Sequence, residues 1–190
     1  KIPDFDVLSD DPKNTANILK ERLRSENIKN IKIVLKPGVG EIIAPHYEIK
    51  TGKETIAFIY EPLSCHSYNK HEINGNIYKI ATLDTMLSFY LAFMFTNRPY
   101  YNEKRILCMS KYLFDVQEKN RLKQKGILKR FTSDCYGIQH TLEEIRRTKA
   151  VLIKNFKKKG IKSGKKYEWH FLKYEPSMKN YRKRKTKEKK

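Results

Sequence analysis

Cysteine is scarce in this sequence of 190 residues, which has only Cys65, Cys108 and Cys135, far apart and with no CxxC pair. An odd number of widely spaced cysteines argues against a disulfide framework and for a reducing compartment. A zinc site needs about four ligands at suitable spacing, and the loose group of Cys65, His66 and His71 does not supply them. The sequence therefore predicts neither a disulfide scaffold nor a zinc site.

A long apolar run is also missing. The longest one, Met86 to Phe95, is much shorter than the ~20 residues that span a bilayer, so it predicts a buried helix and no membrane partner. No signal peptide or internal repeat is visible, and a start at Lys1 is consistent with a fragment. With 39% apolar and 12% aromatic residues, the chain can still build a core.

Acidic residues are few, 21 against 41 Lys and Arg, which gives a net charge of +20. Residues 146–190 carry +16 of this excess, and aromatic side chains are interleaved with the cations there: Phe156, Tyr167, Trp169, Phe171, Tyr174 and Tyr181. Cations beside aromatic faces suit phosphates and stacked bases. We therefore expect RNA as a partner, although a solubilising tail or a localisation signal is the simpler alternative. The expected RNA contacts are Arg146, Arg147, Lys154, Lys157, Lys158, Lys159, Lys165 and Lys166.

The local patterns predict strands first and helices afterwards. Strands are expected at 2–8, 31–35, 41–50, 54–60 and 76–80, with a hairpin at Thr51-Gly52 and a polar loop at 62–75. Helices are expected from Asp11-Pro12 to 25, from Thr82 or Asp84 to 96, from Asn102 to about Gly126, and from the capping box at Thr141 to about 159. The helix ending at 96 is apolar nearly all round, so it should be the central buried helix.

This order of elements predicts an α+β fold: a mixed β-sheet packed by helices, followed by a helical segment and a basic tail. Residues 1–80 should hold the sheet and its helix, and residues 81–176 the helical part of the same domain. Residues 177–190 should be a disordered basic tail.

Two aspartates on the first predicted strand are the candidate catalytic and metal-binding residues. Asp4 and Asp6 are two residues apart, so their side chains point the same way. Adjacent carboxylates repel each other unless a cation lies between them, and Mg²⁺ suits such a pair. A complete site needs a third carboxylate, for which Glu48, Glu54 and Glu61 are candidates, and none stands out by spacing. The alternative is a charged edge strand that only aids solubility.

Several long strings resemble the poly(A) polymerase catalytic subunits of giant, mimivirus-like DNA viruses. The resemblance covers roughly residues 2–176. The strings are residues 3–12, 40–49, 59–69, 83–93, 119–126, 129–131 and 139–144. The longest of them reads Leu83-Asp84-Thr85-Met86-Leu87-Ser88-Phe89-Tyr90-Leu91-Ala92-Phe93.

The resemblance implies an enzyme that adds AMP from ATP to mRNA 3′ ends with Mg²⁺ or Mn²⁺, built from two halves of nucleotidyltransferase topology. One half is catalytic and the other is a degenerate copy. The implied partners are the mRNA 3′ end, the poly(A) tail, the other half of the polymerase and a second copy in a homodimer. The implied location is the host cytoplasm, at the viral factory, or the virion.

Within that resemblance, the chain is similar to the second, C-terminal half. The Gly-Ser segment that precedes the aspartate pair in active members is absent, and Phe58 occupies the position of their third aspartate. The basic C-terminal part also suits RNA binding better than catalysis. The segment is therefore expected to bind RNA and to scaffold the catalytic half. The alternatives are a non-enzymatic RNA-binding or interaction module, and an active nucleotidyltransferase that uses Asp4 and Asp6.

Overall fold

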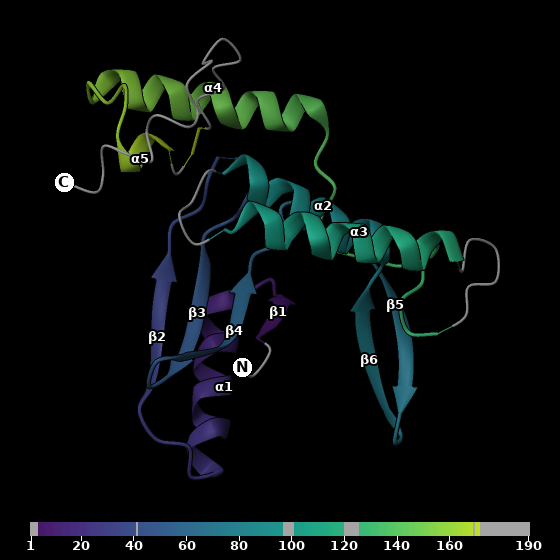
Figure 1. Cartoon of the computed structure of the whole chain (residues 1–190). Helices are drawn as coiled ribbons and strands as arrows, with labels where there is room; N and C mark the ends of the chain where they lie inside the picture. The colour runs from purple at the N-terminus through teal and green to yellow at the C-terminus, as the bar shows by residue number, and fades with distance from the viewer. Residues whose placement is uncertain (1–3, 41, 97–100, 120–125, 169, 172–190) are drawn as a thin grey trace.

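The computed structural model describes residues 4–40, 42–96, 101–119, 126–168 and 170–171, which form two β-sheets and the helices around them (Figure 1). The predicted tail at 177–190 lies outside this part of the chain. The elements run in the order β1 (Phe5–Leu8), α1 (Pro12–Ser25), β2 (Ile31–Lys36), β3 (His46–Thr51), β4 (Glu54–Tyr60), β5 (His66–Ile73), β6 (Asn76–Ala81), α2 (Leu83–Phe95), α3 (Glu103–Lys119), β7 (Cys135–Tyr136), α4 (Leu142–Lys158) and α5 (Lys165–Glu168).

The first sheet has the strand order β1-β4-β3-β2. β1 runs parallel to β4, whereas the other two pairs are antiparallel, so the sheet is mixed. The predicted hairpin between β3 and β4 is present, and Gly52 adopts φ +58°, which glycine tolerates without a steric cost. Helices pack on this sheet, so the predicted α+β class is confirmed.

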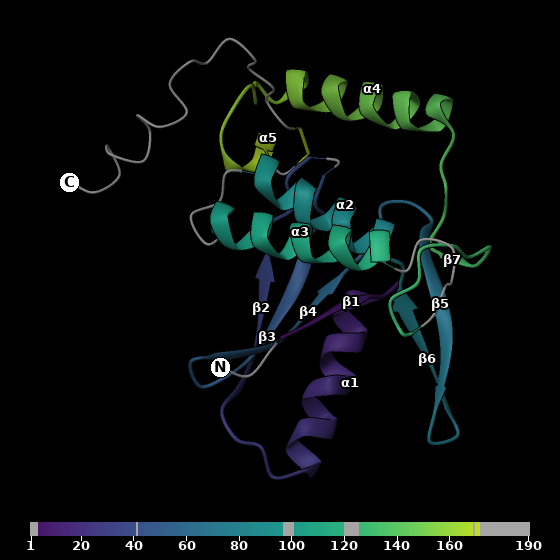
Figure 2. The ribbon, with the colours of Figure 1, turned by 45° about the vertical axis from the view of Figure 1, so that its right-hand side comes forward.

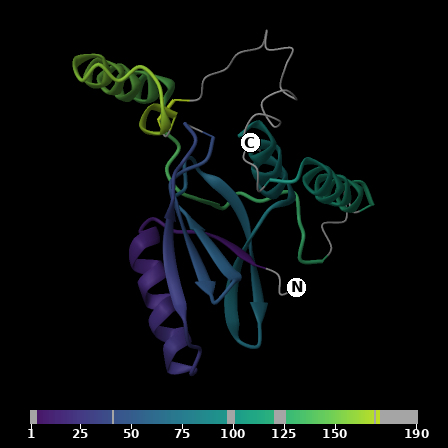
Figure 3. The ribbon, with the colours of Figure 1, turned by 60° about the vertical axis from the view of Figure 1, so that its left-hand side comes forward.

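Helix α1 covers one face of the first sheet (Figure 3). It begins as predicted, since the Asp11 side chain accepts a backbone hydrogen bond of 3.0 Å from the first turn and Pro12 is its first residue. Ala16 on this helix is fully buried and packs with Ile49 and Ile59 of the sheet. Because side chains alternate along a strand, the neighbours of these isoleucines face away from α1.

The opposite face of the sheet packs against α2 and α3 near one end. Tyr60, Phe93 and Ile106 form the centre of this second hydrophobic cluster. The prediction that α2 is a central buried helix is wrong, because α2 lies in an outer layer with α3 and leaves Leu91 and Phe95 exposed. Within the described segments, no helix combines the length and apolar character needed to cross a bilayer.

A second sheet, with the order β6-β5-β7, was not predicted (Figure 2). The loop expected at 62–75 is wrong over β5, which pairs with β6 in an antiparallel hairpin. Asn74 and Gly75 at the turn both have positive φ, +53° and +74°. An Asn-Gly pair is the preferred sequence for a two-residue hairpin turn, so the sequence did contain a hairpin signal. The strand before this turn was missed because β5 carries many polar residues. The predicted domain boundary at 80/81 falls at the end of β6.

Cys65 and Cys135 form a disulfide bond with a Cα–Cα distance of 5.3 Å. The expectation of no disulfide is therefore wrong. The two cysteines are 70 residues apart in sequence and meet only because β7 pairs with the start of β5, with His66 opposite Tyr136. Cys108 is a free, exposed cysteine.

Helix α4 forms an arm beyond the two sheets (Figures 1, 2 and 3). The predicted capping box is present, because Thr141 and Glu144 exchange side-chain to backbone hydrogen bonds of 2.8 and 3.2 Å. Phe156, near the end of α4, is buried by the short segment around α5. The rings that cover it belong to Tyr167, His170 and Phe171, with centroids 5.4 to 6.0 Å from its own.

Candidate functional site

Asp4 and Asp6 lie at the beginning of the first sheet, on its edge strand. Asp4 directly precedes β1, and Asp6 is the second residue of β1, paired with Phe58 of β4. The strand alternation places both carboxylates on the sheet face that packs against α2 and α3. Arg105 of α3 is close enough to act on Asp6 electrostatically.

The electrostatic environment of Asp6 is unfavourable for its charge. Although Asp6 keeps exposed surface, desolvation by the groups packed around its carboxyl raises its pKa to about 6, and the negative charge of Asp4 adds to the rise. A hydrogen bond from the Tyr60 hydroxyl and the positive charge of Arg105 act in the other direction without cancelling it. Burial and the nearby Asp6 in turn raise the pKa of Tyr60. The pair is therefore one that a bound cation would relieve.

The place of a third carboxylate beside Asp6 is occupied by an aromatic ring. Phe58 is the β4 residue in register with Asp6. Its ring lies 5.8 Å from the His46 ring and 6.3 Å from the Tyr60 ring, centroid to centroid, as part of the hydrophobic cluster under α2 and α3. A phenyl ring has no lone pair to offer Mg²⁺, which takes oxygen ligands.

Glu48 is the carboxylate in the same row, one strand further away. It pairs with Phe58 across β3 and β4, so at the usual spacing of strands it lies roughly 10 Å from Asp6 along the sheet. Its oxygens contact Lys36 Nζ at 2.9 Å, Lys50 Nζ at 3.6 Å and the Thr55 hydroxyl at 2.6 Å. Burial alone would raise the pKa of Glu48, but the hydrogen bonds and the two lysines lower it below its ordinary value. Glu48 is thus a paired structural carboxylate.

The other two candidates for a third carboxylate are also placed away from the pair. Glu54 is the first residue of β4 and exposed, at the end of the strand opposite Tyr60. Glu61 directly follows β4 and is exposed. Among the described residues, no group of three or more His, Cys, Asp or Glu side chains could hold a metal ion. The residues present therefore do not fit a complete two-metal site.

Most of the predicted RNA contacts share one face of α4. At 100° per residue, Arg146, Arg147, Lys154, Lys157 and Lys158 fall within an arc of about 120°, and we call them the basic face. All five side chains are exposed. Arg147 is paired with Glu143 at 2.9 Å, on the same face one turn earlier. Of the remaining three, Lys159 and Lys166 are exposed, and Lys165 is the first residue of α5.

The aromatic residues near the C-terminal end pack on one another in part. Phe156 is buried against Tyr167 and Phe171, which are themselves only partly buried. Trp169, Tyr174 and Tyr181 lie outside the described residues. Phe156 therefore has a packing role, and base stacking by the other rings stays a prediction.

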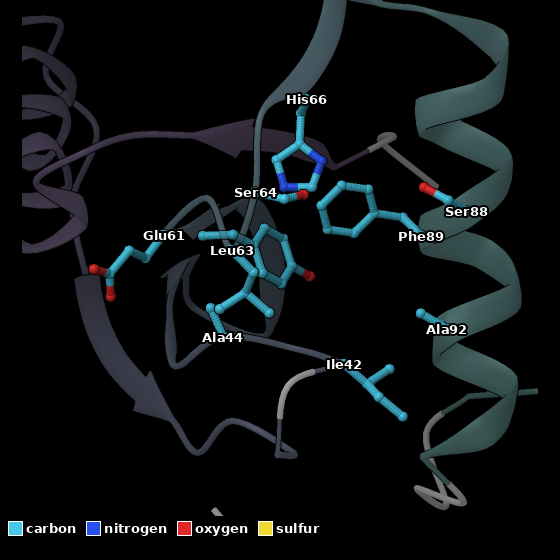
Figure 4. Close-up of a pocket in the computed structure, with 10 residues that line it drawn as sticks. Ile42, Ala44, Glu61, Leu63, Ser64, His66, Ser88, Phe89 and Ala92 are labelled. Carbon is cyan, nitrogen blue, oxygen red and sulfur yellow. The ribbon is translucent and has the colours of Figure 1, made fainter. Parts of the chain in front are cut away.

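Sequence reasoning missed a hollow between the sheet and α2 (Figure 4). Its volume is about 220 Å³. Its walls come from residues 42–44, 60–66 and 88–92, which belong to three of the strings that carry the resemblance described above. No single stretch of sequence marks it, because the three segments meet only in the folded chain.

The mixed sheet and the helices that pack on it define an α+β fold. A crystal structure of the Megavirus polyadenylate synthase is similar to the chain, with a TM-score of 0.57 and 14% sequence identity over 84% of this chain. The chain corresponds to 34% of that longer chain. No protein-family model matches the sequence, and no curated protein matches it.

Proposed function

We propose that this chain is part of a viral poly(A) polymerase that adds AMP from ATP to mRNA 3′ ends. The similarity in fold to the Megavirus polyadenylate synthase supports a poly(A) polymerase-related role. Since the chain spans about a third of that protein, the activity of a complete enzyme is proposed for a longer assembly. Its ATP and its Mg²⁺ or Mn²⁺ would then be held by the other half.

The segment itself is proposed to be a degenerate nucleotidyltransferase half. The observation that carries this proposal is Phe58 opposite Asp6, where a third carboxylate would have to stand. Asp4 and Asp6 alone offer a single carboxylate pair, and the paired Glu48 is not free to join them. Two-metal chemistry needs ligands for both ions, so the segment is expected to lack it.

RNA is the proposed ligand of the basic face on α4. Five exposed cations on one helical face, with one acidic neighbour, present a surface suited to backbone phosphates. Such contacts carry little sequence information, which suits a protein that holds any 3′ end and then poly(A). The contribution to binding should come mainly from charge, because Phe156, the aromatic residue of this helix, is used in packing.

Scaffolding of the catalytic half, or of a second copy, is proposed for the outer surface of α2 and α3. Phe95, Leu107 and Phe114 are 66%, 47% and 52% exposed there. Exposed apolar side chains that gather on two neighbouring helices are typical of a surface that meets another protein.

Adenylate transfer by the purified chain tests the proposal. The chain is incubated with ATP, an RNA oligonucleotide and either Mg²⁺ or Mn²⁺, and RNA binding is measured in parallel by fluorescence anisotropy. The proposal expects bound RNA without extension. Extension of the RNA that Asp4→Asn abolishes would overturn the degenerate role, and absence of any RNA binding would overturn the binding role.

An active site at Asp4 and Asp6 is the second candidate. The raised pKa of Asp6 beside Asp4 favours it, because a carboxylate pair under repulsion is a suitable place for a divalent cation. Mn²⁺ binding to the chain, measured by electron paramagnetic resonance, discriminates the two candidates. Submillimolar affinity that Asp6→Asn removes would support this second candidate.

A further inference from the structure

The hollow beside the carboxylate pair has no role in the proposed function so far. It lies between the end of β4, the start of β5 and one side of α2 (Figure 4). Tyr60 forms part of the wall of the hollow and also donates a hydrogen bond to Asp6, so the hollow adjoins the carboxylate pair. None of the residues that line the hollow belongs to the carboxylate pair or to the basic face.

Rings and short polar groups share the walls of the hollow. The Phe89 ring lies 5.1 Å from the His66 ring, and Tyr60 lies 6.1 Å from Phe89, centroid to centroid. Ser64 and Ser88 add hydroxyl groups, and Figure 4 shows Ser64 beside His66. Aromatic faces together with a few convergent polar groups are typical of sites for small planar ligands.

His66 supplies a polar atom without a partner. Its Nε2 is buried and has no hydrogen-bond partner among the described residues. Burial lowers the pKa of this imidazole, so the ring is neutral near pH 7 and can offer its nitrogen as either donor or acceptor. A buried ring nitrogen without a partner calls for an explanation, and a ligand in the hollow that shifts the neighbouring wall enough to reach this atom would provide one.

We propose that this hollow binds one nucleobase, with the base against Phe89 and its polar edge toward His66. The volume of about 220 Å³ is smaller than that of pockets for whole drug-sized ligands, so it suits a base while the sugar and phosphate remain outside. The base can belong to a free nucleotide or to an unstacked position of single-stranded RNA. In the second case the inference rests on the proposed RNA binding, to which it adds a base contact beside the phosphate contacts of the basic face.

Two pairs of probes separate these sources and remove the contribution of charge. AMP is compared with ribose 5-phosphate by isothermal calorimetry. A fluorescent A12 RNA is compared with an abasic 12-mer of the same charge by fluorescence anisotropy. The wild-type chain should bind AMP better than ribose 5-phosphate, or A12 better than the abasic strand, by about tenfold, which is the usual contribution of one stacked base.

Two substitutions in the full chain test the location. His66→Phe keeps a ring and removes the nitrogen, and Ala92→Leu fills the hollow from α2. Both should abolish the preference for a base and leave binding of the abasic strand unchanged. Leu91→Phe, which enlarges the exposed neighbour of Ala92, is the matched control and should keep the preference. Thermal melts followed by circular dichroism establish that each variant is folded.

Each outcome bears on the inference. A base preference that both variants lose and Leu91→Phe retains supports it. No base preference in either pair of probes overturns it, as does a preference that the folded variants retain. Equal binding of A12 and the abasic strand would overturn the base site for RNA and leave the proposed role of the basic face intact. If the chain binds AMP but no RNA at all, only the proposed RNA role is overturned.

Discussion

Asp6 and Glu48 are two carboxylates in one row of the sheet with opposite environments. Asp6 is beside another carboxylate, and its pKa is raised to about 6. Glu48 is buried between two lysines and a threonine, and its pKa is lowered. A phenylalanine separates them on the intervening strand. The first residue therefore weakens the fold at neutral pH, and the second strengthens it.

Asp6→Asn is expected to stabilise the chain at neutral pH. The folded pKa lies above the ordinary value of 3.8, so the folded state binds more protons than the unfolded state between about pH 4 and 6. The folded state therefore loses stability as pH rises through that window. The amide can still accept the hydrogen bond from Tyr60. We expect the free energy of unfolding to rise by about 1 kcal/mol at pH 7.5 and by less at pH 4. The figure is smaller than the full pKa shift would give, because the side chain keeps solvent contact. Urea unfolding at both pH values measures it, and an equal effect at both would contradict the electrostatic cause.

Glu48→Gln is expected to act in the opposite direction. The folded pKa lies below the ordinary value of 4.5, so the stabilisation is present above that value and is lost as pH falls through the folded pKa. Removing the charge weakens the contacts with Lys36 and Lys50, so the free energy of unfolding should fall by about 1.5–3 kcal/mol at pH 7. The same urea unfolding series measures it, with Glu54→Gln as an exposed control on the next strand. A cost that is as large at pH 3 as at pH 7 would refute the assigned role of the charge.

At the scale of elements, the sequence predicted the helix starts well, because a helix start depends on neighbouring residues. Asp11-Pro12, Asn102 and the Thr141 capping box each begin a helix as expected, because capping depends on residues within one turn. The strand β5 was missed because its residues are mostly polar, although it pairs with the next strand, β6, in a local hairpin. The contact of its first two residues with the distant β7 could not be seen in local sequence. The family resemblance put Phe58 at the position of the third aspartate, and the structure adds that Phe58 pairs in register with Asp6.

The disulfide between Cys65 and Cys135 is expected to hold β7 against β5. Because it closes a loop of 70 residues, its removal by Cys135→Ser should cost about 2–4 kcal/mol of unfolding free energy. Thermal melts under oxidising conditions measure the loss, and Cys108→Ser, at an exposed free cysteine, should have little effect. Two alkylatable thiols at Cys65 and Cys135 in the oxidised native protein would show that the bond is absent.

At the scale of the whole molecule, the basic face and the carboxylate pair are separated in space. The carboxylate pair lies on the first sheet, and the basic face lies on the α4 arm beyond both sheets (Figures 1 and 3). The overall charge predicted a polyanionic partner from composition alone. Only the structure of α4 and its contacts shows which cations share a face. It also shows that Phe156 is used in packing. The hollow under α2 could not be predicted, because three distant segments build it.

RNA binding across a salt series tests the central claim most directly. The five cations of the basic face should give a slope of log affinity against log salt of about −3.5 on single strands, so that affinity falls about a hundredfold between 50 and 200 mM salt. Replacing all five by glutamine should remove most of the slope and leave at most the share of Lys159, Lys165 and Lys166. The control replaces five exposed cations elsewhere, Lys13, Arg22, Lys29, Lys32 and Lys53, and should keep most of the slope. Equal losses in the two variants, or no binding of RNA by the wild-type chain at 50 mM salt, would contradict the account.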